Sequence, residues 1–256
     1  MRLRILGSGT SSGVPRIGND WGTCNPSEPK NRRRRASIMV ETDRTRILVD
    51  TSPDLREQLL DARVASVDAV IWTHDHADHS HGIDDLRQIA IGTRAAVPGY
   101  ARPEASASLQ RRFAYAFEGL EGYYPPTVKM HDLGDDVTIG DIRVRAVDQP
   151  HGAISSAGLR FDWQGYSAGY STDLNALTDD MAKLFKGVDV WIVDALRRKP
   201  HPTHPSLDTA LGWIGRLKPG WAVLVHMDNS MDYAALKAEL PDGVEPGYDG
   251  MELSFA

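Results

Sequence analysis

Residues 73–82 read Thr-His-Asp-His-Ala-Asp-His-Ser-His-Gly and hold four of the chain's nine histidines. An even scatter would place about 0.3 of a histidine in eight residues, so the tract is of the kind that binds metal. It follows an apolar run at residues 67–72, which predicts a buried strand whose carboxyl end carries the histidines, where α/β sheets hold ligands. Imidazole nitrogens with carboxylate oxygens suit zinc, iron, manganese or nickel. An exposed polar turn with a loose affinity for metals is the structural alternative.

The composition is that of a globular protein in a reducing compartment. Hydrophobic residues make up 41% and charged residues 25% of the 256 residues, which permits a large core. The single cysteine, Cys24, cannot form an internal disulfide or a cysteine zinc cage, so we expect a cytoplasmic protein whose metals are held by histidines and carboxylates. The opening residues lack the apolar core of a signal peptide, and no uncharged run approaches the roughly 20 residues of a membrane span.

Short β-rich segments alternate with helical ones along the chain, which predicts a mixed α/β protein. No linker or repeat interrupts the pattern, so residues 1–256 are expected to form a single domain. Residues 92–103, rich in Gly, Pro and Arg, are the candidate for a mobile loop. The expected strands are 2–6, 36–41, 46–50, 69–73, 137–147 as a hairpin, 157–161, 166–170, 188–194, 221–226 and 252–255. The expected helices are 53–62, 104–117, 174–185, 206–217 and 231–240.

The pattern His-x-His-x-Asp-His after a buried strand resembles the signature of the metallo-β-lactamase-fold hydrolases. That superfamily is built as a four-layer αβ/βα sandwich with a metal site at one edge of its two sheets, so the resemblance implies this α/β fold for the whole chain. The family pattern also asks for a mid-chain His, an Asp and a late His, each after a strand. His151, Asp173 and His226 occupy those places in order. Without the tract, either of these histidines would be read as structural.

The resemblance implies two divalent metal ions per chain, with zinc or manganese preferred and nickel or iron as alternatives. The implied ligands are His74, His76 and His151 for one ion, Asp78, His79 and His226 for the other, and Asp173 as a bridge between them. In this family scheme the two ions share a hydroxide, which is available near neutral pH because the ions lower the pKa of bound water, and this hydroxide attacks phosphorus in line. Asp78 lies next to that nucleophile and also orients it.

Two further segments narrow the resemblance to the branch that contains phosphoribosyl cyclic phosphodiesterase and, more distantly, the tRNA 3′-processing endonucleases. One is the loop at residues 6–15, Leu-Gly-Ser-Gly-Thr-Ser-Ser-Gly-Val-Pro, in which Ser11 and Ser12 are candidate substrate contacts. It does not match a Rossmann loop, because Ser12 stands at the third glycine position and no helix pattern follows. A flexible turn is its structural alternative. The other segment is His-Pro-Thr-His at residues 201–204.

This second segment supplies the candidates for protonating the leaving group. His204 resembles the non-ligand histidine that does so in the phosphodiesterase branch, and His201 is the competing candidate and a candidate substrate contact. Two prolines stiffen the loop, so one of the two histidines is expected to face the metals. Exposure of both on a Pro-rich loop is the structural alternative. Asp194, which ends an apolar strand, is a candidate partner for a ligand imidazole or a cap for its loop.

Two features stand apart from the metal pattern. The phosphodiesterase branch also carries a structural zinc bound by several cysteines, whereas this chain has Cys24 and Asn229 in the corresponding regions, so we expect that zinc to be absent. Four consecutive arginines occupy residues 32–35, and Arg35 is a candidate phosphate contact because guanidinium groups suit phosphate oxygens. A solvated face with one inward member is the structural alternative for this run.

The sequence therefore predicts a metal-dependent phosphodiesterase that hydrolyses a small cyclic or nucleotide-like phosphodiester, with Asp78 and His204 as catalytic residues. The net charge of −6, from 29 Lys+Arg and 35 Asp+Glu, disfavours nucleic-acid partners. A tRNA 3′-processing endonuclease is thus the weaker alternative, since no basic, Gly-rich arm is present. A non-catalytic metal-containing protein that binds a small molecule is the third, which the complete ligand set disfavours. The oligomeric state is left open, a homodimer included.

Overall fold

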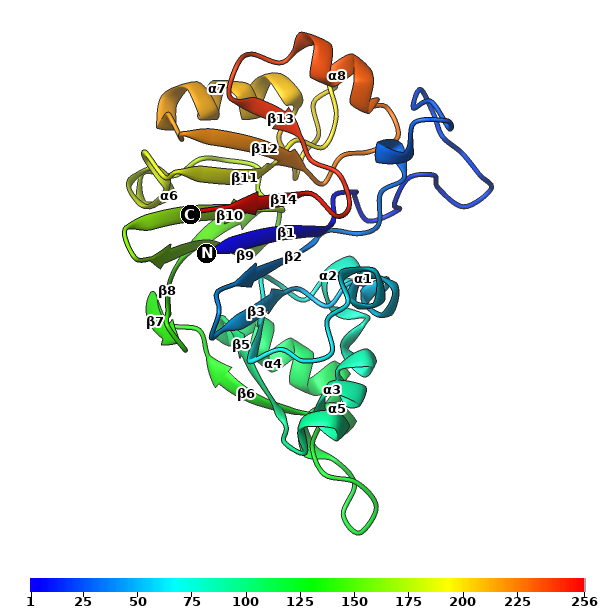
Figure 1. Ribbon diagram of the computed structural model, residues 1–256, viewed down its shortest axis with the longest axis vertical. Coiled ribbons are helices and arrows are strands. Elements are labelled where there is room, and N and C mark those ends of the chain that lie inside the picture. Colours follow the sequence, from blue (N-terminus) through cyan, green and yellow to red (C-terminus); the bar gives the residue numbers. More distant parts are fainter. Residues whose placement is uncertain (256) are drawn as a thin grey trace.

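The computed structural model describes residues 1–255, in which strands and helices alternate along the chain (Figure 1). The strands are β1 (Arg2–Gly7), β2 (Ser37–Glu41), β3 (Arg46–Val49), β4 (Ala69–Trp72), β5 (Val97–Ala101), β6 (Val128–Asp132), β7 (Asp136–Ile139), β8 (Ile142–His151), β9 (Ile154–Trp163), β10 (Tyr166–Ser171), β11 (Val190–Asp194), β12 (Trp221–Val225), β13 (Val244–Pro246) and β14 (Glu252–Ser254). The α-helices are α1 (Leu55–Ala62), α2 (Ala77–Ser80), α3 (Leu86–Thr93), α4 (Pro103–Arg112), α5 (Ala114–Glu118), α6 (Asp179–Phe185), α7 (Leu207–Leu217) and α8 (Tyr233–Glu239). Two 3-10 turns are η1 (Pro29–Asn31) and η2 (Ile83–Asp85).

The strands form two seven-stranded sheets. One sheet has the order β14-β1-β2-β3-β4-β5-β6 and the other β13-β12-β11-β10-β9-β8-β7. Each sheet is antiparallel on one side and parallel on the other, the parallel parts running from β3 to β6 and from β10 to β13. The first half of the chain thus builds one sheet, which β14 completes by pairing with β1, and the two ends of the chain lie side by side (Figure 1).

Apolar side chains fill the space between the sheets because the strands alternate between two buried faces. In β2, Ile38 and Val40 point into this inner layer, whereas Met39 points to the outer face. In β12, Val223 points inward and Leu224 outward. A period of two with apolar residues on both faces is what a sheet covered on both sides requires.

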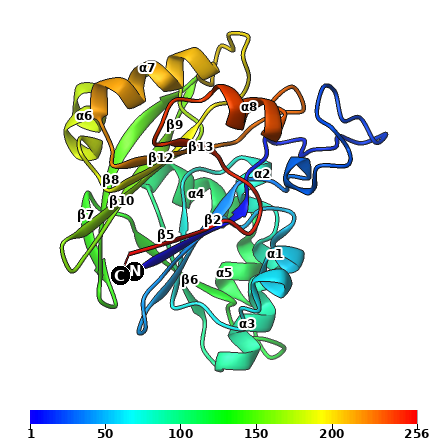
Figure 2. The same ribbon diagram turned by 45° about the horizontal axis from the view of Figure 1, so that its top comes forward.

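Helices cover the outer face of each sheet (Figure 2). The first sheet packs against α1, α3, α4 and α5, and the second against α6, α7 and α8. The resulting order of helices, sheet, sheet and helices confirms the predicted four-layer αβ/βα sandwich. The longest helix, α7, has 11 residues, and none of the helices in residues 1–255 combines the length and apolar character that crossing a bilayer requires.

The prediction of a mobile loop at residues 92–103 is wrong. This stretch contains β5, which is hydrogen-bonded between β4 and β6. Pro98 and Gly99 obscured the strand pattern. Gly99 suits its place because a Cβ there would lie 2.7 Å from the Trp72 ring, so the close approach of strand and ring requires a glycine.

Two predicted helices differ from those of the structure by more than two residues or by a break. The helix expected at residues 104–117 is broken into α4 and α5 at Phe113, whose φ of −122° and ψ of 38° leave the helical region. The helix expected from residue 174 begins only at Asp179, after the Thr178 side chain accepts a hydrogen bond from the amide of Met181. Residues 174–178 are therefore not helical and form part of the connection between β10 and α6.

Candidate metal centre

The predicted ligands meet at one edge of the sandwich, where strands of both sheets end. Because β3 runs parallel to β4, and β10, β11 and β12 are parallel to one another, the residues that follow these strands lie at the same edge. These residues are Asp50 after β3, His74, His76, Asp78 and His79 after β4, His151 at the end of β8, Asp173 after β10, Asp194 at the end of β11 and His226 after β12. The structure thus brings together all seven residues that the sequence predicts as ligands.

Three imidazoles and a carboxylate form the first group. Ligand atoms of His74, His76, His151 and Asp173 all lie within 4.8 Å of one another. His151 Nε2 is 3.4 Å from His76 Nδ1 and 3.5 Å from Asp173 Oδ1, and His74 Nε2 is 3.8 Å from the same oxygen. His76 is exposed and the other three residues are buried. Such a set of nitrogen and oxygen donors could hold one divalent ion.

A second group lies on the other side of Asp173. Ligand atoms of Asp78, His79 and His226 lie within 4.8 Å of one another. Asp173 Oδ2 is 3.0 Å from His79 Nε2 and 3.5 Å from His226 Nε2. Since Oδ1 of the same carboxylate faces the first group, Asp173 is placed to contact an ion in either group. The short tract supplies ligands to both groups because α2 begins after His76 and turns the chain.

Three residues of this edge have left-handed backbone conformations. The φ angles are +64° for Asp50, +56° for Asp173 and +59° for His226. Residues other than glycine rarely adopt this region, so the surrounding structure has to hold each of them there.

Asp50 is a site residue that the sequence analysis missed. Its Oδ1 accepts a hydrogen bond from the amide of Thr73, and its Oδ2 lies 2.7 Å from Nδ1 of His79. This contact fixes the proton on Nδ1 and leaves Nε2 of His79 free to bind a cation. Asp50 ends an apolar strand just as Asp194 does, so the same signal applied to the predicted strand 46–50 would have found it.

Buried negative charge dominates the second group. Burial opposes a positive charge on His79, but the carboxylates around it, Asp173 foremost, hold its pKa well above the usual range. Burial also opposes a charge on His226, and Asp173 and Asp194 outweigh it to raise its pKa to about 9. In the first group burial prevails and lowers the pKa of His74 and His151. The second group therefore attracts cations, protons included.

Unpaired buried nitrogens show that the residues fit metal ions. Nε2 of His74 and both ring nitrogens of His226 are buried without a hydrogen-bond partner among residues 1–255. A buried polar atom without a partner is costly, and an imidazole nitrogen whose ring is held by a neighbour is a good metal ligand. Nδ1 of His74 lies 3.0 Å from the Thr73 hydroxyl, which leaves Nε2 as the free donor. The donor chemistry and the unpaired atoms agree with a pair of divalent ions.

His204 lies beside the two groups and is held by Asp194. Its Nδ1 is 2.7 Å from Asp194 Oδ2, an oxygen that also accepts a hydrogen bond from the amide of Asp173. Its Nε2 is 3.8 Å from Asp173 Oδ1, and its ring stacks on that of His226 at 4.8 Å. The carbonyl of Thr203, the residue before His204, accepts a hydrogen bond from Nδ1 of His151. Asp173, His204 and His226 also lie close enough together to share a cation.

A cavity of about 300 Å³ opens onto the cluster. Its lining comprises Ser11, His76, Asp78, His151, Ala153, Ile154, Asp173, Thr203, His204 and His226. Of the candidate substrate contacts, Ser11 lines the cavity. Ser12 is exposed and does not line the cavity. His201 does not line it either, and its Nδ1 accepts a hydrogen bond from the amide of Thr203 at 3.3 Å.

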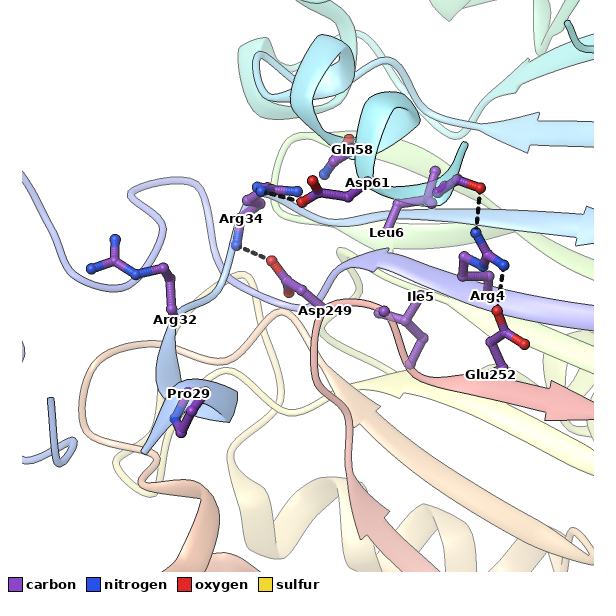
Figure 3. Close-up of a pocket in the computed structure, with 12 residues that line it drawn as sticks. Arg4, Ile5, Leu6, Pro29, Arg32, Arg34, Gln58, Asp61, Asp249 and Glu252 are labelled. Atoms are coloured by element: carbon purple, nitrogen blue, oxygen red, sulfur yellow. Dashed lines mark hydrogen bonds and ion pairs between the residues drawn. The ribbon is translucent and has the colours of Figure 1, made fainter. Parts of the chain in front are cut away.

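The four arginines of residues 32–35 make different contacts. Arg32 lies over the Trp21 ring, and Arg33 is buried. Arg34 pairs with Asp61 across a separate hollow of about 330 Å³ beside β1 and α1, where its amide also donates to Asp249 (Figure 3). Arg4 and Glu252, which also line that hollow, form a second ion pair there. Arg35, the predicted phosphate contact, pairs with Asp54 at 3.1 Å and is not among the residues that line the histidine cavity.

Comparisons with known proteins agree with this geometry. The family described as "Beta-lactamase superfamily domain" matches residues 45–227. An octanoyltransferase of Porphyromonas gingivalis is 34% identical over 262 residues, which cover 98% of this chain and 51% of that protein. An exodeoxyribonuclease, WalJ, of Streptococcus pneumoniae is 21% identical over 165 residues, 62% of this chain and 57% of that protein. The chain thus spans about half the length of the curated relatives that it matches.

Solved structures show the same architecture over the full chain. A protein described as a new diphosphatase from the PhnP family is 36% identical, with a TM-score of 0.90, and the match covers 100% of this chain and 98% of that one. The short form of human tRNase Z, at 16% identity and a TM-score of 0.70 over 99% of both chains, shares the fold. The family match and the 36% identical structure place this chain in the β-lactamase superfamily, among the metallo-β-lactamase-fold hydrolases.

Proposed function

We propose that this chain is a metal-dependent phosphodiesterase that hydrolyses a small cyclic or nucleotide-like phosphodiester. The observation that carries the proposal is the position of His204, which lines the same cavity as both ligand groups while Asp194 holds its other nitrogen. A poor alkoxide leaving group needs a proton donor, which His204 can supply, whereas the thiolate released from a thiol ester leaves without protonation. The 36% identical protein described as a diphosphatase supports a phosphorus centre as the target.

In this proposal the two groups would hold two divalent ions, zinc or manganese by preference, and Asp173 would contribute a ligand atom to each. Nickel and iron also suit these donors. The chemistry that such bound ions supply is Lewis acidity toward the phosphoryl oxygens and a water of lowered pKa. His74, His76 and His151 hold one ion, and Asp78, His79 and His226 hold the other. Asp78, on the cavity wall, also accepts a hydrogen bond from the attacking water and so orients it.

His204 protonates the leaving oxygen in the proposed reaction. Asp194 accepts a hydrogen bond from Nδ1 of His204, so Nε2 faces the cavity and carries the proton that is transferred. The Asp194 carboxylate, which is fully buried, stabilises the imidazolium and fixes the ring orientation. Ser11 lines the cavity from the loop after β1. In this proposal it contacts a non-bridging oxygen of the substrate.

The substrate class is tested by a screen of purified protein loaded with manganese, nickel or zinc. The substrates are ribose cyclic phosphates, nucleoside cyclic phosphates, linear diesters such as bis(p-nitrophenyl) phosphate, and small diphosphates. We expect the highest kcat/KM on a cyclic or nucleotide-like diester. Preferential cleavage of diphosphates, or of precursor tRNA or DNA in place of small diesters, would refute the proposed substrate class.

The role of His204 is tested with His204→Gln and two leaving groups. We expect kcat on an alkyl diester to fall by about 10²- to 10⁴-fold, because alkoxide departure needs the proton. The loss on bis(p-nitrophenyl) phosphate should be much smaller, since p-nitrophenolate leaves without protonation. His131→Gln, which alters a histidine stacked on Tyr100 in β6 outside the cavity lining, is the matched control. Equal losses on both substrates would contradict the acid role.

A further inference from the structure

Arg33 is a buried cation that the proposed reaction does not use. Its side chain is 2% exposed, although it belongs to a run of four arginines. Its guanidinium donates to the carbonyl of Met231 at 2.6 Å and to that of Asp228 at 3.3 Å. The remaining acceptors are the amide oxygen of Asn31 at 3.4 Å and the sulfur of Cys24 at 3.8 Å. None of these four acceptors is a carboxylate, which is unusual for a buried charge.

The two carbonyls belong to the turn that follows His226. This turn closes through a hydrogen bond from the Met231 amide to the Asp228 carbonyl, the group that Arg33 also contacts. His226 itself has a φ of +59°, a conformation that persists only when the surrounding structure enforces it. Arg33 therefore holds the residues immediately after the strained ligand.

The backbone of Arg33 is fixed to the loop that carries Ser11. Its amide donates to the carbonyl of Val14 and its carbonyl accepts from the amide of Val14, both at 2.9 Å. On the other side of the same loop, Met227 donates to Ser8 and accepts from Thr10. The loop at residues 8–15 thus hydrogen-bonds the residue next to His226, and Arg33 hydrogen-bonds the turn beyond it.

We infer that Arg33 is a positioning residue for the second metal position, acting as a cross-link between the loop at residues 8–15 and the turn that follows His226. This inference rests on the proposed function, because it assigns His226 to a metal ion. A guanidinium suits the task, since its fork reaches two carbonyls at once from one rigid plane. The nearby Asn31 extends the cross-link, because its side chain accepts from the amide of Tyr233 at 2.8 Å.

The inference is tested by titrating metal-free protein with Co²⁺ and following its absorption, which reports the number and the coordination of bound ions. Wild type should bind two ions. In Arg33→Met one binding step should weaken by about 10- to 100-fold, the usual effect of removing a group that orients a ligand, while the other step stays unchanged. The affinity of this step in Arg33→Lys should lie between those of wild type and Arg33→Met. Millimolar guanidinium should restore the affinity of the weakened step in Arg33→Ala. At saturating metal, KM should stay near wild type while kcat stays low.

The matched control is Arg160→Met. Arg160 is also mostly buried and donates to a carbonyl, that of Leu184 at 2.8 Å, but it lies within β9 and lines no part of the histidine cavity. Both binding steps of Arg160→Met should match those of wild type. Unchanged binding of both ions in Arg33→Lys and Arg33→Met, or an equal weakening of both steps in Arg33→Met and in Arg160→Met, would overturn the inference. Fewer than two ions in wild type would instead refute the proposed metal pair, so the two failures are distinguishable.

Discussion

At the scale of single residues, the buried carboxylates behind the histidines decide how the candidate site is built. Asp50 faces Nδ1 of His79, and Asp194 faces Nδ1 of His204. Each fixes one nitrogen of a ring and leaves the other directed toward the cluster. A motif of histidines alone does not specify these orientations. The tract was recognisable from the sequence because its spacing is local, whereas the partner carboxylates come from other strands.

Replacing Asp50 should weaken one metal position without disturbing the fold. In Asp50→Asn the amide retains the shape of the carboxylate but no longer favours a proton on Nδ1 of His79. We expect the affinity for one ion to fall by about 10- to 100-fold, measured by competition with a chelator. Glu41→Gln is the control, since Glu41 is also a buried carboxylate but pairs with Arg2 and Arg46 away from the site. Equal metal affinity in Asp50→Asn and wild type would contradict this role.

At the scale of elements, the sequence predicted well the strands whose apolar residues follow one another without interruption. β4, β11 and β12 are recognisable because each is an apolar run before a polar site residue. β5 was mistaken for a loop, because Pro98 and Gly99 are typical of turns and its packing against Trp72 is a tertiary contact. The break between α4 and α5 at Phe113 has no local signal either. Long-range packing, which single-sequence patterns do not contain, explains these misses.

A pair of glycine substitutions tests the assignment of residues 92–103. Gly99→Ala in β5 should destabilise the protein by about 1–3 kcal/mol, because the added methyl would lie 2.7 Å from the Trp72 ring. Gly92→Ala in α3 should stabilise it by about 0.5–1 kcal/mol, because no atom lies within 4 Å and alanine favours a helix. Urea unfolding measures both. If Gly99→Ala unfolded like wild type, residues 97–101 would not be packed between β4 and β6.

At the scale of the whole molecule, Asp141 joins the two sheets at the end opposite the histidines. It lies between β7 and β8, and its carboxylate accepts from the hydroxyls of Thr42 and Thr45, between β2 and β3. It also accepts from the indole of Trp163. Burial raises the pKa of Asp141, but these three donors more than offset it and lower the pKa to about 2. The clamp therefore favours the ionised carboxylate.

Removal of this clamp should give a pH-dependent loss of stability. A carboxyl group whose pKa is lowered by folding contributes stability above its ordinary value of 3.8, and the contribution is lost as the pH falls through about 2. Asp141→Ala should lower the free energy of unfolding by about 1–2 kcal/mol at neutral pH. The difference from wild type should be the same at pH 7 and pH 5 and should shrink below pH 4, when measured by urea unfolding. A difference that grew on acidification would contradict the clamp.

The central claim is that the edge shared by the two sheets holds two catalytic metal ions. The most direct measurement is the metal content of the purified chain together with its rate on bis(p-nitrophenyl) phosphate, before and after treatment with a chelator. We expect close to two transition-metal ions per chain, a loss of hydrolysis when they are removed, and recovery with zinc or manganese. Hydrolysis at the full rate by metal-free protein would contradict the account.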